Sequence, residues 1–228
     1  EVIVSFDLSG TFYVKGYSPE LICSVTGWSP GGSHVTELLW TYSDSTLMIG
    51  SDDGPYVSSA YGGHKPTAQP LLADLDLDGT AELVLSLIEK NSEDPVILAL
   101  DITGSAATSI WEKTLDKGTH PSDPTFVQTD ENTAFVMLTS VQSSTSAMWL
   151  WKLDAADGDS NWDGMSLGNL NGFDSNVPHI RLPGPVVANL DSDDAMEVVI
   201  TIPSDFDGSG SAYGAEYYGM EISDGTKI

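Results

Sequence analysis

The 228-residue chain is long enough for one large all-β domain or two small ones, and its 40% hydrophobic content is typical of a folded globular protein. It carries 34 Asp and Glu against 8 Lys and Arg, which gives a formal net charge of −26. That surface excludes nucleic acid and anionic lipid as partners, because binding either one requires basic side chains to neutralise phosphate, and it favours cations.

The first 61 residues are interpreted as a divergent N-terminal β unit, which we take for a fourth blade. Strand-like runs occur at Glu1–Phe6 and Thr11–Val14, and Leu38–Tyr42 places Trp40 in a third apolar run. No run of 18 apolar residues occurs anywhere in the chain, so no membrane-spanning helix is predicted.

Three further units follow, each opened by a proline at Pro70, Pro124 or Pro185. Each proline precedes a polar loop and then a run rich in β-branched and apolar residues, which predicts a buried strand. These runs are Glu82–Leu87, Ala134–Thr139 and Glu197–Ile202, and the second strands that follow them are Val96–Leu100, Met148–Leu153 and Glu216–Ile222. Glycine-containing turns end the second strands, and Trp111 and Trp162 then lie in the next ones.

A repeat of about 40–60 residues with about four short strands is the sequence form of a β-propeller blade. The predicted fold is therefore all-β, a propeller or partial propeller of four-stranded antiparallel blades, with blades at 62–115, 116–167 and 168–228. Propellers close with about four to eight blades, and the last unit only begins its final strand at Lys227-Ile228. Three interpretations stay open: a fragment of a longer chain, strands supplied by a partner subunit, or a small ring closed by the N-terminal segment.

The most informative motif is the loop from Asp74 to Glu82, which reads Asp-Leu-Asp-Leu-Asp-Gly-Thr-Ala-Glu. Calcium takes six to eight oxygen ligands in flexible geometry. Carboxylates at positions 1, 3 and 5 can point into one concave loop, and a glycine at position 6 permits the sharp turn. The predicted ligands are Asp74, Asp76, Asp78, the backbone carbonyl of Thr80, and Glu82, while Leu75 and Leu77 anchor the loop on the core.

A second loop from Asn189 to Glu197 repeats these ligand types at positions 1, 3, 5 and 9. Its predicted ligands are Asn189, Asp191, Asp193, the carbonyl of Ala195, and Glu197. Asp194 replaces the glycine, so weaker binding is expected. The middle unit has Gln128, Asp130, Asn132 and Val136 at the corresponding positions, and no tight site is predicted there.

An EF-hand is excluded by the residues that follow the first loop. An EF-hand needs a bidentate Glu at position 12 and flanking helices. Position 12 counted from Asp74 is Leu85, within a predicted strand.

The pattern Asp-x-Asp-x-Asp-Gly-x-x-Glu before a hydrophobic strand resembles the calcium-binding FG-GAP/VCBS repeats of integrin-α-type β-propellers. The Ala-Leu-Asp…Gly…Trp segments are also similar to the blade repeat of pyrroloquinoline-quinone-type propellers. The resemblance covers about Pro70–Ile228. It implies a secreted or cell-surface protein whose blades are stabilised by Ca²⁺ and whose relatives serve adhesion, carbohydrate recognition or polysaccharide cleavage. The Phe-Gly and Gly-Ala-Pro signatures of the family name are absent here.

No catalytic set is predicted, because the chain lacks a Gly-x-Ser-x-Gly elbow and a phosphate-binding loop. We therefore expect a non-enzymatic extracellular module for adhesion, surface assembly or ligand recognition, with protein subunits, the rest of a longer chain, or carbohydrate as partners. The alternative is a secreted calcium-dependent polysaccharide lyase, for which Lys65, His64 and Arg181 are equal candidates as the base.

Overall fold

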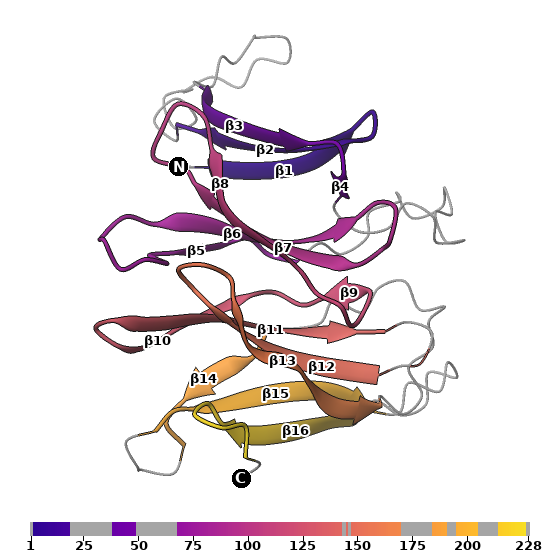
Figure 1. The fold of residues 1–228 in the computed structure, drawn as a ribbon. Helices are drawn as coiled ribbons and strands as arrows, with labels where there is room; N and C mark the ends of the chain where they lie inside the picture. The colour runs from indigo at the N-terminus through magenta and orange to yellow at the C-terminus, as the bar shows by residue number, and fades with distance from the viewer. Residues whose placement is uncertain are drawn as a thin grey trace, which may run out of the picture.

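The computed structural model describes residues 2–18, 38–48, 68–142, 145, 147–169, 184–190, 195–204 and 214–226. Strands and turns make up this part of the chain, and they form four antiparallel sheets (Figure 1). The all-β prediction is therefore confirmed. Within the same ranges, no helix is present that has the length and apolar character to cross a membrane.

The sheets follow one another along the chain. The first sheet contains β1 (Val2–Leu8), β2 (Thr11–Tyr17) and β3 (Leu38–Asp44). The second contains β5 (Leu71–Ala73), β6 (Glu82–Glu89), β7 (Pro95–Asp101) and β8 (Thr108–Thr114), with β4 (Leu47–Met48) paired to the far end of β6. The third contains β10 (Thr125–Asp130), β11 (Thr133–Val141), β12 (Ala147–Asp154) and β13 (Ser160–Asn169), with β9 (His120–Pro121) paired to β11. The fourth contains β14 (Val186–Ala188), β15 (Glu197–Ser204) and β16 (Gly214–Glu221).

The burial of each strand reflects its place in the stack. In β2, buried and half-buried residues alternate, as expected of a strand with one face on the core. In contrast, β6 and β7 are buried along nearly their whole length, because sheets cover them on both sides. This explains why β6 is a continuous apolar run rather than an alternating one.

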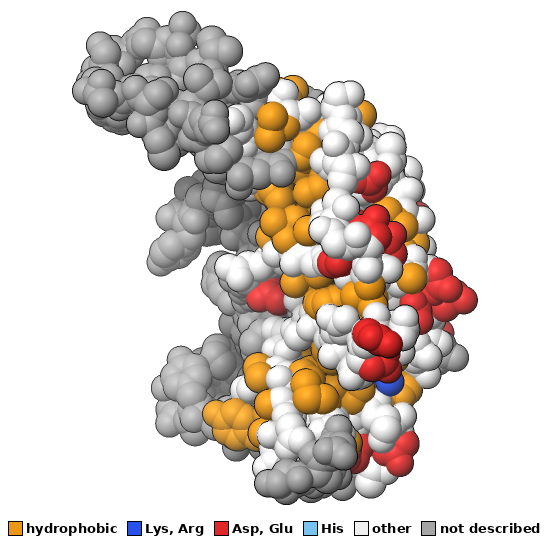
Figure 2. Space-filling model, turned by 90° about the vertical axis from the view of Figure 1, so that its left-hand side faces the viewer, with side chains coloured by type: hydrophobic (Ala, Val, Ile, Leu, Met, Phe, Trp, Pro, Cys, Tyr) orange, Lys and Arg blue, Asp and Glu red, His pale blue; other side chains and the backbone are white. Residues whose placement is uncertain are grey.

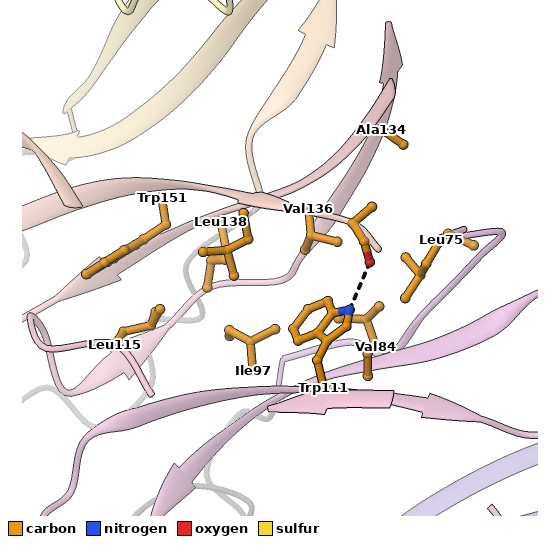
Figure 3. Close-up of a cluster of buried hydrophobic side chains, with 13 residues drawn as sticks. Leu75, Val84, Ile97, Trp111, Leu115, Ala134, Val136, Leu138 and Trp151 are labelled. Carbon is orange, nitrogen blue, oxygen red and sulfur yellow. Dashed lines mark hydrogen bonds between the residues drawn. The ribbon is translucent and has the colours of Figure 1, made fainter. Parts of the chain in front are cut away.

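Three apolar clusters fill the spaces between successive sheets, and together they make the core. The cluster between the second and third sheets is shown in Figure 3, where Ile97, Trp111 and Val84 point toward Val136 and Leu138. Face-to-face stacking of consecutive small antiparallel sheets is the arrangement of propeller blades. The described chain is therefore a partial propeller of four successive sheets.

A tryptophan in the outermost strand of one sheet packs on a glycine turn of the next. The Trp111 indole Nε1 donates a hydrogen bond of 2.8 Å to the Ala155 carbonyl oxygen (Figure 3). A Cβ added at Gly158 would lie 2.7 Å from Trp111 Cε3, so only glycine fits against the ring. Gly225 occupies the corresponding turn near Trp162, but an added Cβ there would first meet Met165 Cε and would lie at an ordinary contact distance of 3.7 Å from the Trp162 ring.

A buried lysine also joins the third and fourth sheets. The Lys152 ammonium donates a hydrogen bond of 2.9 Å to the Ile222 carbonyl oxygen and lies 4.0 Å from the centroid of the Phe135 ring. The Lys152 side chain is 7% exposed, and burial lowers its pKa. The aromatic ring and the carbonyl together replace part of the hydration that the ammonium loses.

The first sheet repeats the strand pairing of the second, which relates the divergent N-terminal unit to the other blades. Trp40 pairs with Gly16 as Trp111 pairs with Ala99, and a register shift follows each pair at the same place. The strand order also shows that β4, which lies within the 1–61 segment, belongs to the second sheet.

Candidate metal centre

The Asp74–Glu82 loop connects β5 to β6 and brings three carboxylates together. One oxygen from each of Asp74, Asp76 and Asp78 can be chosen so that all three lie within 4.8 Å of one another. Asp74 is half-buried, and the other two are exposed. This spacing suits three ligands of one cation, whose bonds to oxygen are about 2.3–2.6 Å for calcium.

Backbone amides hold these carboxylates in place. The Asp78 N–H donates to Asp74 Oδ1 at 2.9 Å and to Asp76 Oδ1 at 3.2 Å, and the Gly79 N–H donates to Asp74 Oδ2 at 2.9 Å. Leu77 and Gly79 both have positive φ, at 62° and 93°, so the chain curls tightly around the carboxylates. The glycine predicted for the sharp turn therefore lies where a left-handed residue is needed.

The two leucines of the loop attach it to the core. Leu75 is 2% exposed within the cluster between the second and third sheets, and Leu77 is half-buried against the same cluster. They alternate with the carboxylates, which leaves Asp76 and Asp78 on the solvent side.

Glu82 closes the loop from the first residue of β6. Its Oε2 accepts a hydrogen bond of 2.7 Å from the Leu75 N–H, and the residue is buried. Burial raises the pKa of the Glu82 carboxyl, and the negative charges of Asp76, Asp74 and Asp78 add to this, against the Leu75 amide hydrogen bond, which lowers the pKa. Clustered carboxylates thus oppose one another here, and a bound cation would relieve that repulsion.

The described part of the second loop repeats this closing contact. Glu197 Oε2 accepts a hydrogen bond from the Leu190 N–H, as Glu82 does from Leu75. Glu197 is fully buried, and its Oε1 has no hydrogen-bond partner among the described residues. Asn189 and Ala195 also lie in the described part, whereas Asp191 and Asp193 lie outside it.

The orphaned Glu197 oxygen tests whether the second loop suits a cation. A buried carboxylate oxygen without a partner is costly, so such atoms are normally hydrogen-bonded or bound to a metal. A cation beside Glu197 Oε1 would satisfy it, and the donor types of the loop are the oxygens that Ca²⁺ prefers.

The middle unit forms an ordinary hairpin at the corresponding place. Gln128 pairs with Ala134 and Asp130 with Thr133, which leaves a short turn in which the Asn132 N–H donates to Asp130 Oδ1. The strand register also aligns Phe135, rather than Val136, with Glu82 and Glu197. The middle loop is therefore one residue shorter and has an aromatic ring in place of the closing carboxylate.

Sequence reasoning missed the contact between the ninth residue of each loop and the amide of the second. The only signal for it was the recurrence of Glu at position 9 directly before an apolar strand. The candidate bases Lys65, His64 and Arg181 lie outside the described residues.

No family model matches the chain, and no curated protein sequence matches it. One solved structure that it resembles is an α-L-arabinofuranosidase from Clostridium thermocellum, at 12% identity and a TM-score of 0.37. The match covers 95% of this chain and 67% of that enzyme. At this level the likeness carries no argument about function, and the site rests on its own geometry.

Proposed function

We propose that the chain is a calcium-stabilised β-propeller module of an extracellular or cell-surface protein, with a non-enzymatic role in adhesion, surface assembly or ligand recognition. The observation that carries the proposal is the convergence of Asp74, Asp76 and Asp78 above a buried Glu82. The orphaned oxygen of Glu197 supports a second, weaker site in the equivalent loop.

The donor chemistry favours Ca²⁺ over other cations. All the candidate ligands are carboxylate, amide or carbonyl oxygens on a loop that follows a short strand, and Ca²⁺ accepts such irregular sets. Mg²⁺ requires a near-ideal octahedron with shorter bonds and retains its water. Calcium would be held by Asp74, Asp76, Asp78, the Thr80 carbonyl and Glu82, where it supplies positive charge and cross-links the loop.

The proposed role of the metal is structural. The loop joins β5 to β6, and its leucines pack between the second and third sheets. A cation that fixes the loop therefore also fixes one side of that inter-sheet contact. The proposed location is outside the cell, where Ca²⁺-binding modules work with dissociation constants of about 10⁻⁴–10⁻³ M.

The test is thermal unfolding of the full chain with Ca²⁺, with Mg²⁺ and with excess chelator, alongside calorimetric Ca²⁺ titration. We expect Ca²⁺ to raise Tm, because a ligand that binds only the folded state stabilises it. Asp76→Ala should abolish the tighter binding step and most of the Tm increase, whereas Asp130→Ala should leave both unchanged. Equal small effects of the two substitutions would refute the assignment of the loop.

A secreted polysaccharide-active enzyme on the same scaffold is the competing function. The same preparation, loaded with Ca²⁺, should release no reducing ends from a panel of neutral and acidic polysaccharides. Turnover that is lost on chelation would overturn the non-enzymatic part of the proposal and leave the calcium sites intact.

A further inference from the structure

The outward side of the fourth sheet has the composition of a surface that binds another sheet. Aligning the strand registers places Val199 of β15 at the position of Val84 and Met137 in the two preceding sheets. Tyr217 of β16 takes the position of Ile97 and Leu150 in the same way. In the second and third sheets these four side chains are 0% exposed, because the next sheet covers them.

In the fourth sheet the same positions are less covered among the described residues, because Val199 is half-buried and Tyr217 is exposed. Tyr217 is 71% exposed, and Val186, on the same side of β14, is 62% exposed. A hydroxyl residue also recurs at one position of this side, as Ser86, Thr139 and Thr201. We call Val186, Val199, Thr201 and Tyr217 the C-face.

The first sheet presents the complementary side at the opposite end of the stack (Figure 1). Phe12, Val14 and Trp40 point inward to the core, so the alternate residues of β2 point outward, together with the β3 residues that the register sets opposite them. These outward residues, which we call the N-face, are Tyr13, Lys15, Tyr17, Leu38, Thr41 and Ser43.

The positions of the N-face also match an inter-sheet contact. The register places Tyr13, Lys15 and Tyr17 where β7 has Val96, Leu98 and Leu100. Those three residues of β7 pack against the first sheet and are at most 1% exposed. On the N-face, by comparison, Leu38 is 47% exposed.

The charge of these faces distinguishes them from the rest of the molecule. The chain has 34 acidic residues, and acidic side chains predominate over basic ones on the surface shown in Figure 2. Neither the four C-face residues nor the N-face residues include Asp or Glu, and the N-face contains Lys15. Glu197 and Glu221 face the same side as the C-face but lie at one end of it, at the first residue of β15 and the last residue of β16. Two copies of a chain with a net charge of −26 can therefore approach through these faces with the least repulsion.

We propose that the C-face of one copy binds the N-face of a second copy, head to tail, so that two four-sheet stacks close into a ring of eight sheets. One chain carries both halves of the contact. The residues of each half occupy the same positions in their sheet as the residues that form the contacts between sheets inside the stack. Eight sheets lie within the range of about four to eight blades at which propellers close. A head-to-tail contact is heterologous, and two such contacts close a pair. The proposal does not depend on calcium.

The test is sedimentation of the full chain over a range of concentrations, in about 0.15 M salt, where the Debye length is about 8 Å. We expect a concentration-dependent species of twice the 24.2 kDa chain mass. Tyr217→Asp and Leu38→Asp should each weaken self-association by about tenfold or more, since each places a charge within the proposed apolar contact. Ile110→Asp, at a 44% exposed site on β8 outside both faces, is the matched control and should leave it unchanged.

Mixing the two variants separates this arrangement from its alternatives. Tyr217→Asp retains an intact N-face and Leu38→Asp an intact C-face, so the mixture should form a pair with one good contact. The proposal is overturned if the unmodified chain remains a monomer, as when another segment or protein covers the faces. It is also overturned if only one variant weakens association, which indicates a like-with-like contact, or if a ladder of higher masses replaces the pair.

Discussion

Glu197 combines complete burial with an oxygen that has no hydrogen-bond partner among the described residues, and this makes it a sensitive reporter of a bound cation. Without metal, the free energy of unfolding of Glu197→Gln should be at least that of the unmodified chain. The gain should be no more than about 1–3 kcal/mol, because a neutral amide costs less to bury than a carboxylate. With Ca²⁺, the order should reverse as the unmodified chain gains a ligand-dependent increment. Urea unfolding of the two proteins, once with Ca²⁺ and once with chelator, measures the difference in stability under each condition. Glu131→Gln, at an exposed turn, is the control.

Tyr42 gives a pH-dependent prediction at the contact of the first two sheets. Burial, together with the carboxylates of Asp44 and Glu112, raises the pKa of its phenol to about 12. An unfolded tyrosine ionises near about pH 10. Between these two values only the unfolded state loses the proton, so this residue lowers stability as pH rises through the window.

In Tyr42→Phe the loss of stability over this window should be smaller, and the last component of the tyrosinate absorbance titration should disappear. Tyr217→Phe, at an exposed tyrosine, should leave that last component in place. Persistence of the high-pH component in Tyr42→Phe would show that another group is responsible.

At the level of elements, the glycine turn that packs on Trp111 should be sensitive to mutation. Gly158→Ala should destabilise the chain for two reasons: Gly158 has φ of 74°, and the added Cβ would meet the Trp111 ring. Gly168 has φ of 97° with nothing within 4 Å, so Gly168→Ala carries the backbone strain alone. Gly158→Ala should therefore lose about 1–3 kcal/mol more in free energy of unfolding than Gly168→Ala, which is the cost of overpacking. Equal losses would mean that Trp111 moves aside without cost.

The main strands could be predicted from sequence because their apolar runs are long. Glu82–Leu87 was predicted and β6 is Glu82–Glu89, and Met148–Leu153 was predicted where β12 is Ala147–Asp154. The two-residue strands β4 and β9 were not predicted, because so short a segment has no periodicity. Each of them is positioned by pairing with the end of a longer strand that comes later in the chain: β4 pairs with the end of β6, and β9 with the end of β11.

The candidate site was predictable to the extent that its ligands alternate with core residues. Alternation fixed which side chains of Asp74–Asp78 turn outward, and the structure brings all three together. The one-residue shortening of the middle loop was not predictable from aligned prolines. It depends on where β10 and β11 begin to pair, and a bulge between Gln128 and Asp130 shifts that point.

At the scale of the whole molecule, the net charge of −26 should oppose the compact state. In buffer that contains chelator, Tm should therefore rise steadily with NaCl, because salt screens repulsion between carboxylates. The rise should be steeper without Ca²⁺ than with it, since bound calcium already offsets part of the charge. Differential scanning calorimetry across a salt series measures it, and a Tm that falls with salt would show that attractive pairs dominate.

The forward reach of Trp111 has a consequence for synthesis on the ribosome. Its indole hydrogen-bonds a carbonyl 44 residues later in the chain, so a newly made sheet cannot bury this ring until the next sheet has left the exit tunnel. Trp162 and Met165 likewise lie near the Gly225 turn of the fourth sheet, which is made later still. Nascent chains should therefore mature in the order in which they are translated, each sheet waiting with an exposed aromatic ring for the one behind it.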